Sequence, residues 1–143
     1  MRTLFREYQA QLFPRYRDRS LESELAKLPG VYSPPRGKLL LATVMGQPVG
    51  CVGLRPFALE GASEMKHLYV RPALRGWSIG KELVERVIQQ ARALGYAWLR
   101  LDTHPPTMQA ALAMYRKLGF READPPPDAI KGLVFMELNL RPA

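Results

Sequence analysis

Three basic side chains and two glycines stand ahead of an apolar helical repeat in the segment RPALRGWSIGKEL, residues 71–83. These five residues are Arg71, Arg75, Gly76, Gly80 and Lys81. The first amide groups of a helix have no internal partner and lie at the positive end of its dipole, and nearby glycines let the backbone approach an anion. The segment can therefore hold a phosphate, although an ordinary helix start with surface charges has the same residue types.

The segment matches neither of two common nucleotide-binding patterns. A P-loop has four residues between its glycines and a Ser or Thr after its lysine, whereas three residues separate Gly76 from Gly80 and Glu82 follows Lys81. A dinucleotide fingerprint has three glycines, and only two occur here. Taken alone, the residues leave both interpretations open.

Other residue types that often do chemistry are few. Cys51 is the only cysteine, which excludes an internal disulfide, and its apolar neighbours favour a core position over a nucleophile. His67 and His104 are the only histidines, and their separation fits no recognisable ligand spacing. We therefore expect no metal site.

Composition and charge indicate one folded domain with an anionic partner. The 143 residues suit a single domain, residues 1–143, with 47% hydrophobic residues. The net charge of +8 favours a nucleic acid, a phosphorylated cofactor or an acidic substrate. The basic aromatic segment FPRYRDR, residues 13–19, suggests nucleic acid, but such runs are usually a solvated face, and we do not favour that partner.

The sequence also bears on location. The longest apolar stretch, residues 39–46, is far shorter than a membrane-spanning helix. The first seven residues carry charges where a signal peptide would need an apolar core. We expect a cytoplasmic protein with no membrane partner.

Hydrophobic periodicity predicts alternating blocks of helix and strand. The predicted helices cover residues 4–13, 21–28, 79–94 and 107–118, with Gly95 and Gly119 ending the last two. The predicted strands cover residues 38–45, 48–57, 63–70, 96–103, 119–124 and 132–140. Short turns favour an antiparallel meander of the first three strands, whereas the helical crossover after 63–70 requires a parallel neighbour. We expect an α+β fold with a mixed, largely antiparallel central sheet flanked by helices.

Two motifs, in this order, resemble the GCN5-related N-acetyltransferase (GNAT) superfamily. They are SEMKHLYVRPALRGWSIGKELVERVIQQARALGY and LDTHPPTMQAALAMYRKLGF. In that family a strand ending like LYV leads into an R-x-x-G-x-G/A loop, and a later helix ends in Y-x-x-x-GF. The resemblance covers residues 39–140, and residues 1–38 match only as two preceding helices. It implies a three-layer α/β fold. Many members also have a strand before the first helix, and here this chain departs from the family, because we expect no such strand in it.

The resemblance implies acetyl-coenzyme A (acetyl-CoA) as co-substrate and assigns residues to it. Backbone groups of Leu68 and Val70 would contact the acetyl carbonyl and the pantetheine arm. The pyrophosphate would lie on seven consecutive residues, Arg75, Gly76, Trp77, Ser78, Ile79, Gly80 and Lys81. Ser78 stands where the family usually has glycine, so a positive φ there would cost energy that glycine would not.

The resemblance also suggests catalytic residues. Tyr115 matches the tyrosine that commonly protonates the coenzyme A thiolate, although its place on an apolar helical stripe is equally typical of a core residue. Glu64 matches a strand position that carries a general base in some members. The alternatives are a water chain as the base, with Glu64 as a solvated strand glutamate or one paired with Lys66 through a bridging group. His104, at the carboxyl end of strand 96–103, is a candidate substrate-pocket residue.

Strand 63–70 has side chains on two faces of the predicted sheet. Regular alternation places its side chains on two faces, with Glu64, Lys66, Leu68 and Val70 on one and Met65, His67 and Tyr69 on the other.

Together these features predict an acetyl-CoA-dependent N-acetyltransferase. It would act on a primary amine, of a small molecule or a peptide, by direct attack in a ternary complex. A coenzyme A-binding module without catalysis is the alternative. The sequence does not name the acceptor, and the chain could be a monomer or a homodimer.

Overall fold

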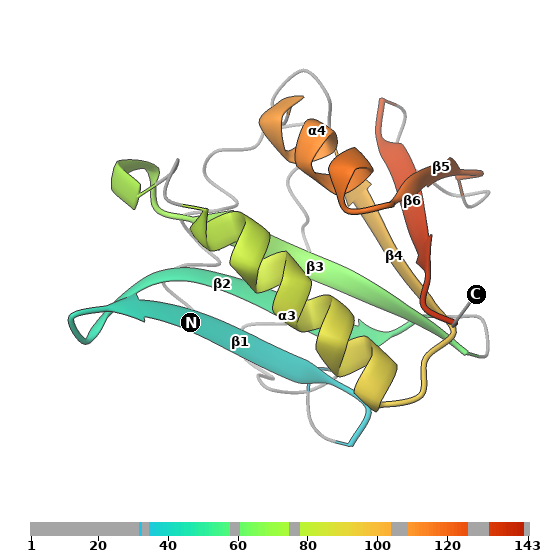
Figure 1. Ribbon diagram of the computed structural model, residues 1–143, viewed down its shortest axis with the longest axis horizontal. Coiled ribbons are helices and arrows are strands. Elements are labelled where there is room, and N and C mark those ends of the chain that lie inside the picture. The colour runs from blue at the N-terminus through green and yellow to red at the C-terminus, as the bar shows by residue number, and fades with distance from the viewer. Residues whose placement is uncertain are drawn as a thin grey trace.

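The computed structural model describes most of the chain from residue 32 onward (Figure 1). The described residues are 32, 35–57, 61–74, 78–103, 109–125 and 132–141. The helices predicted at 4–13 and 21–28, and the question of an earlier strand, lie outside this part. None of the described helices is long and apolar enough to cross a membrane.

Six strands form one mixed sheet in the order β1-β2-β3-β4-β6-β5. The strands are β1 (Lys38–Val44), β2 (Gln47–Pro56), β3 (Ala62–Val70), β4 (Trp98–Thr103), β5 (Arg121–Ala123) and β6 (Val134–Asn139). The helices are the short 3-10 helix η3 (Pro72–Leu74), α3 (Ile79–Ala93) and α4 (Gln109–Lys117). Only β3 and β4 pair in parallel among these strands, as the helical crossover requires. The predicted α+β class and mixed sheet are confirmed.

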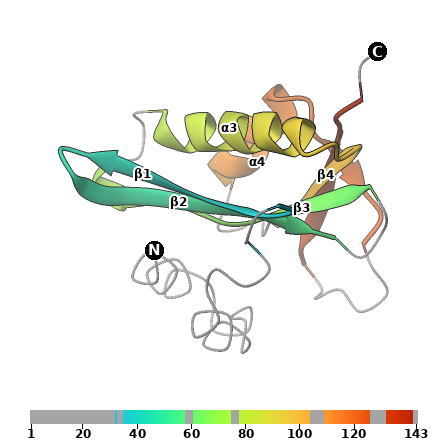
Figure 2. The ribbon, with the colours of Figure 1, turned by 90° about the horizontal axis from the view of Figure 1, so that it is seen from below.

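Helix α3 supplies the main packing layer on the sheet. Its apolar stripe is buried, and consists of Leu83, Val84, Val87, Ile88 and Ala91. These residues share a core with Val52 and Leu54 of β2. Gly95, with φ 86°, ends the helix in the predicted place, because its N–H and that of Tyr96 donate to carbonyls of the last turn. Figure 2 shows α3 and α4 on the same side of the sheet.

A β-bulge in β3 overturns the predicted alternation of side chains. In the antiparallel β2–β3 pair Leu54 lies opposite Met65 and Gly50 lies opposite Val70. Leu54 and Gly50 are an even number of residues apart and Met65 and Val70 an odd number, so β3 contains one extra residue. His67, with φ 59°, occupies the irregular stretch.

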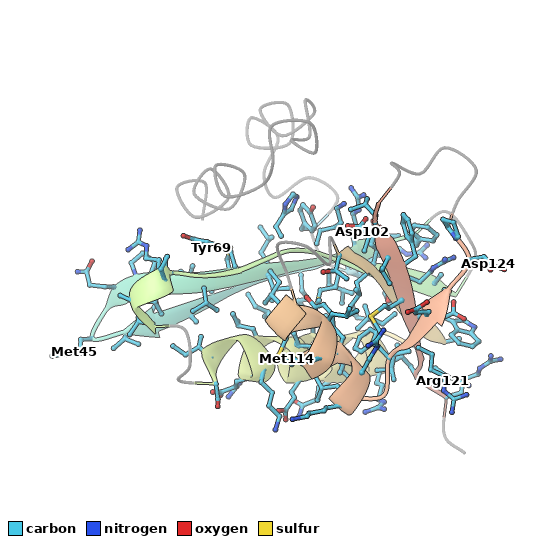
Figure 3. The ribbon with its side chains drawn as sticks, turned by 90° about the horizontal axis from the view of Figure 1, so that it is seen from above. Met45, Tyr69, Asp102, Met114, Arg121 and Asp124 are labelled. Atoms are coloured by element: carbon cyan, nitrogen blue, oxygen red, sulfur yellow. The ribbon has the colours of Figure 1, made fainter. Side chains whose placement is uncertain are left out.

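The bulge changes which side chains face the helices. Leu68 and Val70 pack against the same core as Met65, on the α3 side. Lys66 and Glu64 lie opposite Gly53 and Arg55, on the other face, and Tyr69 lies opposite Cys51 on that face too. Figure 3 shows Tyr69 and Asp102 on the side of the sheet away from the helices, and Met114 on the helical side. The prediction that Glu64, Lys66, Leu68 and Val70 share a face was wrong.

Candidate active site

Strands β3 and β4 are paired only where both begin. Their parallel register covers Ala62 to Glu64 against Trp98 to Arg100, although each strand continues well beyond those residues. Figure 1 shows the two strands diverging toward their carboxyl ends. Leu68 and Val70, the residues predicted to contact the acetyl group and the pantetheine arm, lie in the part of β3 beyond this pairing.

Ser78 begins helix α3 in a left-handed conformation, with φ 62° and ψ 16°. Its carbonyl oxygen accepts a hydrogen bond from the N–H of Glu82 at 3.0 Å, so it is the N-cap residue. Its side chain makes no capping hydrogen bond to the amide groups of the first turn. Ser78 therefore has the positive φ considered in the sequence analysis, which costs about 1–2 kcal/mol in a residue with a Cβ.

Gly80 lies beside the end of β3. A Cβ at Gly80 would be 3.7 Å from Cγ2 of Val70, an ordinary contact. The fold therefore brings the end of β3 next to the first turn of α3, as the predicted binding of one ligand by both requires. Ile79 packs at the edge of the core. Lys81 is more than half exposed, and its Nζ lies 3.9 Å from Oε1 of Glu85, a loose ion pair within the helix.

Four predicted site residues lie outside the described residues. Arg75, Gly76 and Trp77 precede Ser78, and His104 follows β4. Their assignments stay predictions. Within the described part of the chain, no group of three His, Cys, Asp or Glu side chains could hold a metal ion.

Glu64 is held by an arginine on the neighbouring strand. Arg55 lies directly opposite in the β2–β3 register, and its Nε and Nη2 are 3.0 Å and 2.8 Å from Oε1 of Glu64. The glutamate side chain is 9% exposed. Glu64 is therefore engaged at Oε1 by a short, largely enclosed ion pair.

Tyr115 is a buried residue of α4. It is 5% exposed, in the same core as Leu101 of β4 and Leu112 of α4. Its ring centroid lies 5.7 Å from that of Phe120, at an angle of 57°. Gly119, with φ 101°, makes the turn that brings Phe120 back, and the Phe120 N–H donates to the Tyr115 carbonyl at 3.0 Å. The core position foreseen for Tyr115 is confirmed, and a buried tyrosine can still use its hydroxyl.

Sequence reasoning missed two partners on the face away from α3. Arg55, not Lys66, pairs with Glu64, and Lys66 instead lies 3.9 Å from Asp102 on β4, from Nζ to Oδ2. The sequence did indicate that Glu64 has a partner on β2, because a hairpin between β2 and β3 places a residue of β2 opposite it. The identity of that residue depends on the length of the loop between the strands.

Comparison with known proteins identifies the family. The model of the acetyltransferase (GNAT) family matches residues 1–120. The chain belongs to the GNAT family.

Individual relatives of this GNAT domain agree with the match. An uncharacterised N-acetyltransferase of Schizosaccharomyces pombe is 38% identical over 123 residues, which cover 85% of this chain and 75% of the relative. A GNAT-family acetyltransferase structure from Staphylococcus aureus has a TM-score of 0.81 at 23% identity, covering 98% of this chain and 93% of that one, and shows the fold. A GNAT acetyltransferase structure from Elizabethkingia anophelis with acetyl-CoA bound has a TM-score of 0.61 at 26% identity, covering 72% of this chain and 76% of that one.

Proposed function

We propose that this GNAT domain transfers the acetyl group of acetyl-CoA to a primary amine by direct attack in a ternary complex. The observation that carries the proposal is the start of α3 at Ser78, whose side chain makes no capping hydrogen bond, next to the end of β3 where β3 and β4 have diverged. The family match and the acetyl-CoA bound in the Elizabethkingia relative support it.

The described residues fit the phosphate end of the co-substrate. The first amide groups of α3 are not capped by the Ser78 side chain, and Gly80 has no side chain to keep an anion away from them. Lys81 is exposed beside them, and its loose pair with Glu85 costs little to break. We place the pyrophosphate here, with Arg75, Gly76 and Trp77 in the same binding segment.

The reaction defines what the other residues must do. Acetyl-CoA supplies an acetyl thioester, whose carbonyl carbon the neutral amine attacks. As the C–N bond forms and the C–S bond breaks, the sulfur takes up a proton and the nitrogen loses one. We assign the first proton to the Tyr115 hydroxyl, the acid that the family resemblance suggests.

The nitrogen's proton has two routes. Glu64 lies at the point where β3 and β4 diverge, which suits a general base, and its Oε1 is held by Arg55. A chain of water molecules is the second route. Because the Arg55 pair engages the glutamate, a module that binds coenzyme A without turnover is the competing function.

Thermal unfolding with and without acetyl-CoA tests co-substrate binding. We expect acetyl-CoA at 100 times its Kd to stabilise the protein by about 2.7 kcal/mol and to raise Tm by several degrees. ATP serves as a control for non-specific anion binding by a chain of charge +8. No rise in Tm at millimolar acetyl-CoA, or an equal rise with ATP, would rule the proposal out.

A further inference from the structure

Lys66 and Asp102 form an ion pair across the diverging strands. Each lies two residues beyond the last paired positions, Glu64 and Arg100, and on the same face as those residues. Beyond that point β3 and β4 no longer pair, so the two side chains reach toward each other across the opening. Their Nζ and Oδ2 atoms are 3.9 Å apart.

This pair is loose and accessible. A charge-assisted hydrogen bond between an ammonium and a carboxylate is about 2.7–2.9 Å long, so the lysine and the aspartate attract each other without a direct hydrogen bond. The two side chains are 22% and 28% exposed, whereas the Glu64 side chain is 9% exposed. Because this pair has no direct hydrogen bond and both side chains are partly exposed, another cation can replace the lysine at lower cost than in the Arg55–Glu64 pair.

The opening between β3 and β4 is where the proposed function needs an amine. Aliphatic primary amines are protonated at neutral pH, and their ammonium group has the same chemistry as Lys66 Nζ. A carboxylate beside the opening, on the face away from α3, can receive that group.

We infer that Asp102 binds the protonated amine of the acceptor, and that Lys66 Nζ occupies the acceptor's position when no acceptor is present. The inference rests on the proposed function and adds a substrate class to it, namely cationic aliphatic amines. The acceptor displaces Lys66 and is held as the ammonium ion before the reaction. One proton then passes to water, so that the neutral nitrogen can attack, and the second nitrogen proton leaves to Glu64 or water as the C–N bond forms. Asp102 is thus an acceptor-binding residue, and Lys66 is an internal competitor.

The inference predicts opposite effects for the two partners. Asp102→Asn removes the carboxylate, and we expect the KM of alkylamine acceptors to rise about 10- to 100-fold, as for the loss of a hydrogen bond between charged groups. Lys66→Gln removes the competitor, and we expect KM to fall at least twofold. Lys66→Arg keeps a cation and should restore the wild-type KM. If the pair is only a structural tie, Asp102→Asn and Lys66→Gln break it alike and change KM in the same direction.

The experiment measures thiol release from acetyl-CoA with spermidine, tyramine, phenylalanine methyl ester and a lysine-containing peptide. Glu122→Gln and Arg116→Gln are the controls, because these residues form an exposed ion pair of 3.1 Å elsewhere on the surface. Both controls should leave KM unchanged, and the Tm of each variant shows whether it is folded.

The outcomes separate the two levels of the proposal. Opposite shifts in KM support the inference. Turnover in which the two substitutions act in the same direction, or not at all, overturns it and leaves the acetyltransferase function standing. If the wild-type protein is stabilised by acetyl-CoA and yet releases no thiol with any of the four amines, the proposed catalytic function fails and the inference fails with it.

Discussion

Arg55 contacts Oε1 of the Glu64 carboxylate through two nitrogens, Nε at 3.0 Å and Nη2 at 2.8 Å, across the β2–β3 hairpin. The pair joins the central strands at the point where β3 and β4 begin to diverge. It therefore bears on both the stability of the sheet and the chemistry proposed for the opening.

Removing one partner of the Arg55–Glu64 pair leaves the other charged group with little contact with solvent. We expect Arg55→Gln to lower the free energy of unfolding by about 2 kcal/mol, less than for a fully buried pair because the arginine side chain is 28% exposed. The double substitution Arg55→Gln with Glu64→Gln should recover most of the loss, because no buried charge is then left unpaired. Urea denaturation of the three variants measures this, and equal stabilities of the single and double variants would contradict it.

For catalysis, Glu64→Gln tests the general base. Loss of a general base typically costs about 10²- to 10⁴-fold, and we expect kcat to fall within that range. Steady-state thiol release gives the value, with melting curves to confirm folding. A kcat within threefold of the wild type would assign the proton to water instead.

Ser78→Gly should stabilise the protein. The left-handed conformation costs a residue with a Cβ about 1–2 kcal/mol, while glycine loses about 0.4–1 kcal/mol through the greater freedom of its unfolded chain, so we expect a net gain of about 0.5–1 kcal/mol. Ser78→Ala is the control, because it keeps the Cβ and removes a hydroxyl that makes no capping hydrogen bond. Chemical denaturation should show a gain for glycine alone, and a loss on Ser78→Gly would show that the serine is not strained.

Gly80→Ala separates folding from ligand binding. The added methyl group meets Val70 at an ordinary distance of 3.7 Å, and alanine favours a helix over glycine by about 0.5–1 kcal/mol. We expect a protein at least as stable as the wild type that binds acetyl-CoA at least tenfold more weakly, because the methyl group lies where the anion must approach. Calorimetric titration with acetyl-CoA measures the Kd of the wild-type protein and of the variant. An unchanged Kd would remove Gly80 from the binding segment.

Tyr115→Phe tests the proposed acid. The phenylalanine keeps the ring contact with Phe120, so the variant should fold, and we expect kcat to fall at least 10²-fold. Tyr96→Phe is the matched control. The Tyr96 hydroxyl donates to the Arg36 carbonyl at 2.8 Å, and its loss should cost about 1 kcal/mol of stability and no activity. Equal kcat values for the Tyr115 variant and the wild type would leave Tyr115 as a core residue only.

The sequence predicted the elements well because their signals are local. The apolar stripe of α3 and the glycine after it are confirmed by the buried face and by the positive φ of Gly95. The parallel pairing of β3 with β4 followed from the length of the crossover, which admits one arrangement.

The site was harder to predict because it depends on register. Histidine adopts a positive φ more often than most residues, but this preference does not locate a bulge, and the bulge at His67 moves Leu68 and Val70 to the opposite face from Glu64. The Arg55–Glu64 pair depends on how β2 and β3 align across the loop that joins them. The Lys66–Asp102 pair depends on where β3 and β4 stop pairing. Hydrophobic periodicity encodes neither alignment. Ser78 was the exception, since a motif position normally occupied by glycine pointed to its backbone conformation.

The most direct test of the central claim is release of coenzyme A thiol when the protein is mixed with acetyl-CoA and the four amines, with mass spectrometry of the amines. We predict thiol release that depends on an amine, together with an equal amount of an acetylated amine 42 Da heavier. Thiol release that is no faster with any amine than without one, from a protein that acetyl-CoA stabilises, would contradict the claim and leave a coenzyme A-binding module.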